Sequence, residues 1–143
     1  MKKLHSAGVI VYTKKNGETL YLLLHNTKGH WDFPKGNIES GEGKKTAALR
    51  ELKEEASITA TLHDGFEQEV SYVFSDRYFL KAHKKVFYFV GQAQSTNVQV
   101  SSEHDDFGWF SLNDALARVQ FKDAREVLKK AGEFVEGLRF KQE

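Results

Sequence analysis

Two short apolar runs near the start of the chain, Val9 to Tyr12 and Leu20 to Leu24, are separated by a polar segment that contains Asn16 and Gly17. An Asn-Gly pair between runs of aliphatic and β-branched residues is a strong signal for a two-stranded hairpin. The pattern therefore predicts two antiparallel strands joined by a tight turn.

The next segment, from Asn26 to Gly43, is rich in glycine and contains Pro34, the only proline of the chain. Glycine permits positive φ and close approach of the backbone, and proline stiffens it, so this composition favours a shaped binding loop over a slack linker. Residues Lys44 to Ala56 then consist largely of alanine, leucine, lysine and glutamate without glycine or proline, which predicts a helix.

The second half of the chain predicts further strands and then helix. Phe66 to Phe74 and Val86 to Ala93 have the alternation and aromatic content of strands, and a basic, aromatic segment from Asp76 to Lys85 joins them. A short strand is expected from Phe107 to Phe110. The order strand, strand, helix, strands, helix predicts a mixed sheet with helices on its faces.

The C-terminal segment is predicted to be helical, with Asn113 or Asp114 as the cap of a short first helix. Beyond it, apolar residues recur at helical spacing, which predicts one face packed on the sheet. These positions are Ala124, Val127, Leu128, Ala131, Phe134, Val135 and Leu138.

Composition is that of an ordinary soluble, globular protein. The 143 residues are 40% hydrophobic and 29% charged, which favours a single domain spanning residues 1–143. A net charge of +1 gives no global field for nucleic acid or anionic membrane, so neither is an expected partner. Cysteine is absent, the N-terminal apolar run is too short to span a membrane, and no obligate protein partner is indicated. We therefore expect a cytoplasmic protein.

The predicted helix carries an apolar stripe beside an acidic one. The apolar stripe holds Ala48, Leu52 and Ala56, and the acidic stripe holds Glu51, Glu54 and Glu55. Carboxylates at this spacing repel one another, and Mg²⁺, which prefers oxygen ligands, would neutralise them. The alternative is a solvated charged face on which Arg50 and Lys53 pair with the acids. The helix alone leaves both interpretations open.

Residues on either side of the helix extend this pattern. The spacing G-x5-E-x7-R-E-U-x-E-E-x-G-U, with U aliphatic, is matched at eight of its nine specified positions. This is the signature of the Nudix hydrolases, which the chain therefore resembles. The matching residues are Gly36, Glu42, Arg50, Glu51, Leu52, Glu54, Glu55 and Ile58. The departure is Ser57, where the family usually has glycine, and a positive φ there would cost serine roughly 1 kcal/mol.

The resemblance implies an α+β fold of the Nudix type, an α/β/α sandwich with a mixed β-sheet flanked by helices. It also implies that Glu51, Glu54 and Glu55 hold Mg²⁺, with Mn²⁺ as a substitute and the Gly36 carbonyl as a further ligand. Arg50 would orient carboxylates by bidentate pairing rather than touch the substrate. The implied reaction is metal-assisted hydrolysis of a substituted diphosphate.

Two stretches are also similar to the asymmetric diadenosine tetraphosphate hydrolases within the family. They are His30-Trp31-Asp32-Phe33-Pro34-Lys35-Gly36 and, further on, Ser102-Glu103-His104, Trp109 and Gln120-Phe121-Lys122. This resemblance implies that His30, Lys35 and Lys84 contact the polyphosphate. Tyr72 and Phe121 would then stack on adenine.

Some of these roles have alternatives that the sequence leaves open. Tyr72 and Phe121 are equally compatible with core or edge packing, and His30 with a turn residue. Lys84 is preferred over Lys85 because of its register with the strand that follows.

Glu103 lies outside the predicted helix, and the resemblance implies that it is a metal ligand or the general base. The alternative is an exposed acid in a run with Asp105 and Asp106. In that case Glu51 or Glu54 would deprotonate the water, because carboxylates crowded around a metal can share both duties.

The favoured function is asymmetric hydrolysis of diadenosine tetraphosphate to AMP and ATP. Alternatives with the same chemistry are hydrolysis of a nucleotide sugar, a nucleoside triphosphate or 5′-triphosphate RNA. The RNA enzymes of the family usually have glutamine in place of Lys35, which disfavours that substrate. A non-catalytic nucleotide-binding module is disfavoured because it would not need three crowded acids.

Overall fold

The computed structural model describes residues 2–75, 78 and 80–142, with side chains described as far as residue 138. Its elements are β1 (Lys2–Lys15), β2 (Glu18–Asn26), β3 (Trp31–Asp32), β4 (Lys35–Asn37), α1 (Lys44–Ala56), β5 (Ala60–Leu62), β6 (Gln68–Ser75), β7 (Lys81–Ala93), β8 (His104–Phe110), α2 (Leu112–Arg118) and α3 (Lys122–Gln142). The strands form an eight-stranded mixed sheet, in which β1 pairs antiparallel with β2 and parallel with β7. The expected hairpin is confirmed, because Asn16 and Gly17, with φ of 52° and 79°, join β1 to β2.

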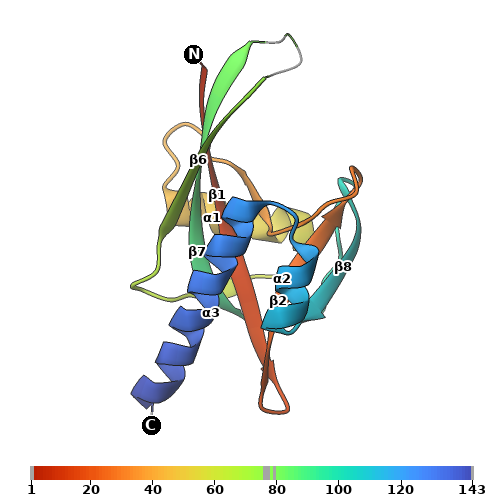
Figure 1. Cartoon of the computed structure of the whole chain (residues 1–143), viewed down its shortest axis with the longest axis vertical. Helices are drawn as coiled ribbons and strands as arrows, with labels where there is room; N and C mark the ends of the chain where they lie inside the picture. The colour runs from red at the N-terminus through yellow and green to blue at the C-terminus, as the bar shows by residue number, and fades with distance from the viewer. Residues whose placement is uncertain (1, 76–77, 79, 143) are drawn as a thin grey trace.

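Helices cover both faces of this sheet (Figure 1). On β1, Val9 and Val11 pack in the core cluster that contains α1, whereas Ile10 and Tyr12 pack in the cluster that contains α2 and α3. Alternate residues of a strand point to opposite faces, so a fully buried run requires cover on both sides. The predicted α/β/α sandwich is confirmed.

The helix predicted at Lys44–Ala56 has these same bounds in the structure. Its apolar stripe of Ala48, Leu52 and Ala56 is fully buried. The apolar face predicted for the C-terminal helix is also buried, with Leu128 of α3 0% exposed. Within the described residues, no helix has both the length and the apolar character needed to cross a membrane.

Helix α1 is capped at its C-terminus by Ser57, whose φ of 61° lies in the left-handed region. Glycine has no β carbon to strain there, so Ser57→Gly is expected to raise the free energy of unfolding by about 0.5–1 kcal/mol. The gain is limited because the Ser57 hydroxyl donates to the Gln99 carbonyl oxygen at 3.1 Å. Urea unfolding beside Ser57→Ala tests this, since alanine keeps the strain and loses the hydrogen bond. A Ser57→Gly protein that is no more stable than the Ser57→Ala protein would contradict the strain argument.

Several strands differ from those predicted. β7 begins at Lys81 rather than Val86, so much of the expected connection from Asp76 to Lys85 is strand, while residues 76, 77 and 79 lie outside the described residues. There β7 pairs with an N-terminal extension of β1 that starts at Lys2. The segment predicted as a loop from Asn26 to Gly43 contains β3 and β4, and β5 was not predicted. Strands of two or three residues are too short to establish an alternating pattern.

The cap predicted for α2 was wrong. Ser111, rather than Asn113 or Asp114, occupies the N-cap, and its hydroxyl accepts a hydrogen bond from the Asp114 N–H at 3.2 Å. The available signal was a serine followed three residues later by an acid, a spacing typical of helix starts.

Candidate active site

Strand β4 brings the backbone of Gly36 against the acidic side of α1. A β carbon at position 36 would overlap the carboxylate of Glu51, so only glycine leaves room for that group. Gly8 on β1 allows a similar close approach, because a β carbon there would lie 2.7 Å from the Pro34 carbonyl oxygen. The glycine-rich segment and the helix acids are therefore in direct contact.

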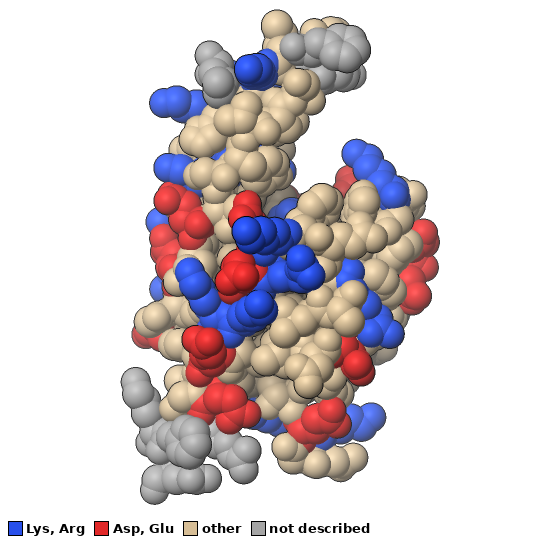
Figure 2. Space-filling view, in the orientation of Figure 1, with Lys and Arg blue, Asp and Glu red and all other residues tan. Residues whose placement is uncertain are grey.

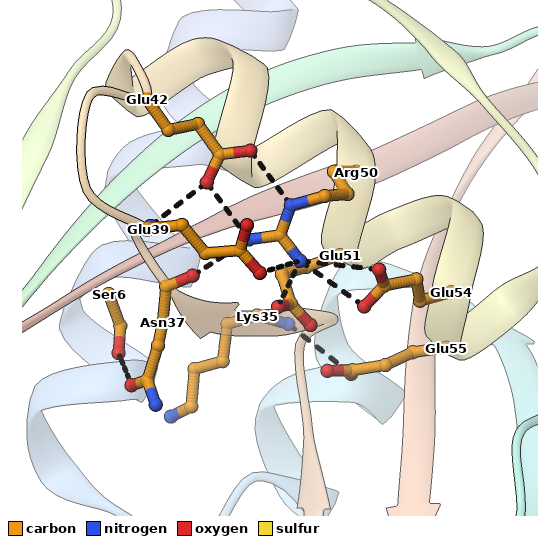
Figure 3. A network of polar contacts seen from close by, with 9 residues as sticks. All are labelled: Ser6, Lys35, Asn37, Glu39, Glu42, Arg50, Glu51, Glu54 and Glu55. Carbon is orange, nitrogen blue, oxygen red and sulfur yellow. Dashed lines mark hydrogen bonds and ion pairs between the residues drawn. The ribbon is translucent and has the colours of Figure 1, made fainter.

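Arg50 gathers the carboxylates on this side of α1 (Figure 3). Its Nε and Nη2 donate to the two oxygens of Glu42 at 2.8 and 2.9 Å. Its Nη1 donates to Glu51 at 2.8 Å and to Glu54 at 3.2 Å, and Nη2 also donates to the Asn37 carbonyl oxygen at 2.8 Å. Hydrogen bonds from Arg50 and from a backbone N–H lower the pKa of Glu42 to about 2. The bidentate pairing expected of Arg50 is present, with Glu42 as its partner.

Glu55 lies deeper, with 8% of its surface exposed. Its Oε1 accepts a hydrogen bond from the Lys35 backbone N–H at 3.4 Å, and His104 Nε2 lies 3.7 Å from the same oxygen. Burial, together with the carboxylates of Glu51 and Glu103, raises the pKa of Glu55 to about 8. At neutral pH the Glu55 carboxyl therefore holds a proton in the metal-free protein.

This raised pKa predicts how stability depends on pH when metal is removed. The folded protein binds a proton at Glu55 more tightly than the unfolded chain does, so stability is lost as pH rises from about 4.5 to about 8. Urea unfolding in a chelator should show a wild-type free energy that falls over this range relative to that of Glu55→Gln. Parallel pH profiles for the two proteins would contradict the assignment.

Glu103 comes from the loop that precedes β8. This loop is tied to the end of α1, because the N–H groups of Gln99 and Ser101 donate to the carbonyl oxygens of Ala56 and Glu55, each at 3.0 Å. Carbonyl groups in the last turn of a helix lack partners within it, so the loop caps α1. The Glu103 side chain is exposed, yet its charge acts on Glu55. Glu103 is thus exposed, as the alternative expected, and its charge also reaches Glu55.

A pocket of about 400 Å³ adjoins this acidic centre. It is lined by Asp32, Lys35, Val70, Tyr72, Tyr88, Phe121, Lys122, Asp123 and Ala124. Figure 2 shows the molecule hollowed beneath the β6–β7 hairpin, which projects at the top of the view. Tyr72 and Phe121 are 39% and 50% exposed, so neither belongs to the core. The alternative of an edge aromatic fits Tyr72, because its strand β6 pairs with β7 off the main path of the sheet.

Two of the predicted cations lie on one side of this region. Lys35 Nζ is 2.8 Å from Asp32 Oδ2 and donates to the Tyr88 hydroxyl at 3.4 Å. Burial lowers the pKa of Lys35, but Tyr88 and Asp32 outweigh it and raise that pKa above its ordinary value. Lys84 is paired with Tyr72 across the β6–β7 ladder, and burial together with the charge of Lys35 lowers the pKa of Lys84.

His30 lies beside Phe121, which lines the pocket. Its ring Nδ1–H donates to the Gln120 side-chain oxygen, and its ring centroid is 5.2 Å from that of Phe121. Of the residues predicted to bind substrate, Lys35, Tyr72 and Phe121 line the pocket. His30 and Lys84 are not in its lining, and they neighbour Phe121 and Tyr72, respectively.

The acids supply the carboxylate oxygens that a hard divalent cation prefers. The charges of Glu51 and Glu103 both act on Glu55 and raise its pKa, so the three carboxylates interact. A carboxyl that holds a proton among other acids can exchange that proton for a metal ion. Glu54 pairs with Arg50, and in the described part of the chain no three His, Cys, Asp or Glu side chains already form a cluster able to hold an ion.

Comparison with known proteins identifies the family. Residues 2–131 match the model of the NUDIX domain, so the chain belongs to the Nudix family, whose hydrolases generally use a divalent metal. The asymmetrical bis(5′-nucleosyl)-tetraphosphatase of Sus scrofa is 34% identical over 92% of this chain and 95% of that protein. The Caenorhabditis elegans protein of the same name is 32% identical over 93% and 97%. A crystal structure of a C. elegans Ap4A hydrolase binary complex matches with a TM-score of 0.83 and 31% identity, over 94% and 98% of the two chains.

Sequence reasoning missed the other polar residues of the pocket, which are Asp32, Tyr88, Lys122 and Asp123. Asp32 stands three residues before Lys35, and this spacing was the one available signal of an ion pair. Tyr88 lies within a predicted strand, and no sequence pattern indicates that its hydroxyl faces a lysine.

Proposed function

We propose that the chain is a metal-dependent hydrolase that cleaves diadenosine tetraphosphate asymmetrically to AMP and ATP. The observation that carries this proposal is the continuity of the site. The pocket beside Tyr72 and Phe121 is also lined by Lys35, and the next residue, Gly36, contacts Glu51. The site thus presents, in order, a surface for the base, a cation for the phosphates and a hydrolytic centre for the scissile bond. The substrate carries these parts in the same order. Similarity to two asymmetrical tetraphosphatases supports the choice of substrate.

We assign the metal to the acidic centre, with Mg²⁺ as the ion and Mn²⁺ as a substitute. Its ligands would be Glu51, Glu54, Glu55 and Glu103, together with the Gly36 carbonyl oxygen. These are the oxygen donors that Mg²⁺ prefers, and substrate phosphates complete such sites. When bound, the ion supplies charge neutralisation at the diphosphate and lowers the pKa of a water.

The protein side chains orient the reacting groups and move the proton. Arg50 holds Glu51 and Glu54 through the hydrogen bonds from its Nη1, and Glu42 in turn holds the guanidinium. Glu103 is the proposed general base because it approaches the helix acids from a separate loop. Glu51 and Glu54 are the alternatives for this role.

The substrate is bound by cations and aromatic rings. His30, Lys35 and Lys84 would donate hydrogen bonds to the polyphosphate, and Tyr72 and Phe121 would stack on adenine. The proposal includes no nucleic acid, membrane or obligate protein partner. It includes a cytoplasmic location, for which the composition of the chain is the sole support. The intact acids disfavour a non-catalytic binding module.

A substrate panel tests the proposal. The values of kcat/KM would be measured with Mg²⁺ for diadenosine polyphosphates, nucleoside triphosphates, nucleotide sugars and 5′-triphosphate RNA. The value for diadenosine tetraphosphate is expected to be the largest. A larger value for a nucleotide sugar or for RNA would reassign the substrate, and a chain inactive on the whole panel would contradict hydrolysis.

A further inference from the structure

Two of the three N–H donors of the Lys35 ammonium are engaged within the pocket wall. Nζ lies 2.8 Å from Asp32 Oδ2 and donates to the Tyr88 hydroxyl at 3.4 Å. The side chains of Lys35 and Asp32 are 23% and 17% exposed, so this arrangement is largely shielded from water. An ammonium held at two donors directs the third along a defined line, whereas an unrestrained lysine samples many rotamers.

The carboxylate that holds Lys35 is itself fixed. Asp32 Oδ1 accepts a hydrogen bond from the Phe33 backbone N–H at 2.8 Å, which leaves Oδ2 toward the lysine. Asp32 belongs to β3, where it is paired with Leu24 of the buried strand β2. The orientation of Lys35 is therefore tied to the sheet.

Asp32 also acts on a second cation. The positive charge of Lys35 and the negative charge of Asp32 both influence Lys84, which is half-buried. Two ammonium groups close together repel one another, and the negative charge of Asp32 offsets that repulsion at Lys84. The trio carries a net charge of one positive unit rather than two.

We infer that Asp32 is a positioning residue that holds Lys35, beside Lys84, in the orientation that receives a polyphosphate. The inference rests on the proposed function, because it takes a polyphosphate as the ligand of these lysines. A simple charge argument predicts the opposite effect, since removal of a carboxylate from an anion site should tighten anion binding. The sign of the effect therefore separates positioning from charge.

Binding of inorganic tripolyphosphate in excess chelator, measured by isothermal titration calorimetry on the full chain, tests the inference. Asp32→Asn is expected to weaken binding about tenfold, as is typical for loss of a charge-assisted hydrogen bond. Lys35→Met should weaken binding at least as much. In the Lys35→Met background, Asp32→Asn should cause no further weakening, because Asp32 acts through Lys35.

Glu126→Gln is the matched control. Glu126 is not in the pocket lining and forms an exposed ion pair with Lys129, so its loss should leave binding unchanged. Tyr88→Phe removes the other contact of Lys35 while keeping the ring, and it should also weaken binding. This variant supplies the test if thermal unfolding shows that Asp32→Asn does not fold.

Three results would overturn the inference. The first is wild-type protein that does not bind tripolyphosphate. The second is an Asp32→Asn protein that binds tripolyphosphate at least as tightly as wild type, or a Tyr88→Phe protein that does so if Asp32→Asn does not fold. The third is an Asp32→Asn substitution that weakens binding equally in the wild-type and Lys35→Met backgrounds. Tripolyphosphate carries no nucleoside, and no hydrolysis is measured in this assay. Failure of the proposed function would instead appear as a lack of diadenosine tetraphosphate hydrolysis by the wild-type protein.

Discussion

Replacing Glu55 by glutamine is expected to lower kcat by roughly 10²–10³-fold, at or above the loss seen when groups that support a metal site are removed. Glutamine keeps the shape of the side chain but cannot lose a proton to become the charged oxygen ligand that a metal requires. The metal-free fold should be at least as stable as wild type at neutral pH, because wild-type Glu55 stays protonated in the fold at a pH where the unfolded chain releases that proton. Steady-state kinetics with saturating Mg²⁺ and thermal unfolding in a chelator measure the two effects.

Glu126→Gln is the control for this variant. Glu126 lies on α3 and forms an ion pair with Lys129 at 3.6 Å, with both side chains more than half exposed. An exposed pair of this kind contributes little, so neither activity nor stability should change appreciably. A Glu55→Gln protein as active as Glu126→Gln would show that Glu55 has no part in the reaction.

Alanine at Gly36 should have the second largest effect. Its β carbon would occupy the space of the Glu51 carboxylate, which must then move away from its hydrogen bond with Arg50. A displacement of about 1 Å at a reacting group can cost on the order of 10²-fold in rate, so kcat/KM should fall by that amount. Crowding should also lower the free energy of unfolding by about 1–3 kcal/mol.

Gly137→Ala controls for the general effect of replacing glycine. A β carbon at position 137 in α3 meets no atom within 4 Å. Alanine favours helix over glycine, so this variant should be stabilised by about 0.5–1 kcal/mol with unchanged activity. Similar kinetics for the Gly36→Ala and Gly137→Ala proteins would contradict the close contact between β4 and α1.

Local patterns account for the parts of the fold that the sequence predicts. Helix α1 follows from its composition and from the stripe of Ala48, Leu52 and Ala56, all of which are buried. The hairpin follows from Asn16 and Gly17, which both take positive φ. The first residues of β7, Lys81 to Lys85, are not predicted as strand because they are largely polar. They form strand by pairing with β1 and β6, which are distant in sequence.

The same distinction holds in the candidate site. The family resemblance implies a Gly36 carbonyl beside the helix acids, and the structure brings the backbone of Gly36 against Glu51. The hydrogen bond from Lys35 to the Tyr88 hydroxyl depends on how two strands distant in sequence are arranged, which local spacing does not predict. The exposure of Tyr72 and Phe121 likewise depends on the projection of β6 and the start of α3.

Analysis of the products formed from diadenosine tetraphosphate with Mg²⁺ tests the central claim most directly. The expected result is AMP and ATP in equal amounts, resolved by chromatography, with turnover abolished by excess chelator. Formation of ADP as the sole product, or equal activity in the chelator, would contradict an asymmetric, metal-dependent hydrolase.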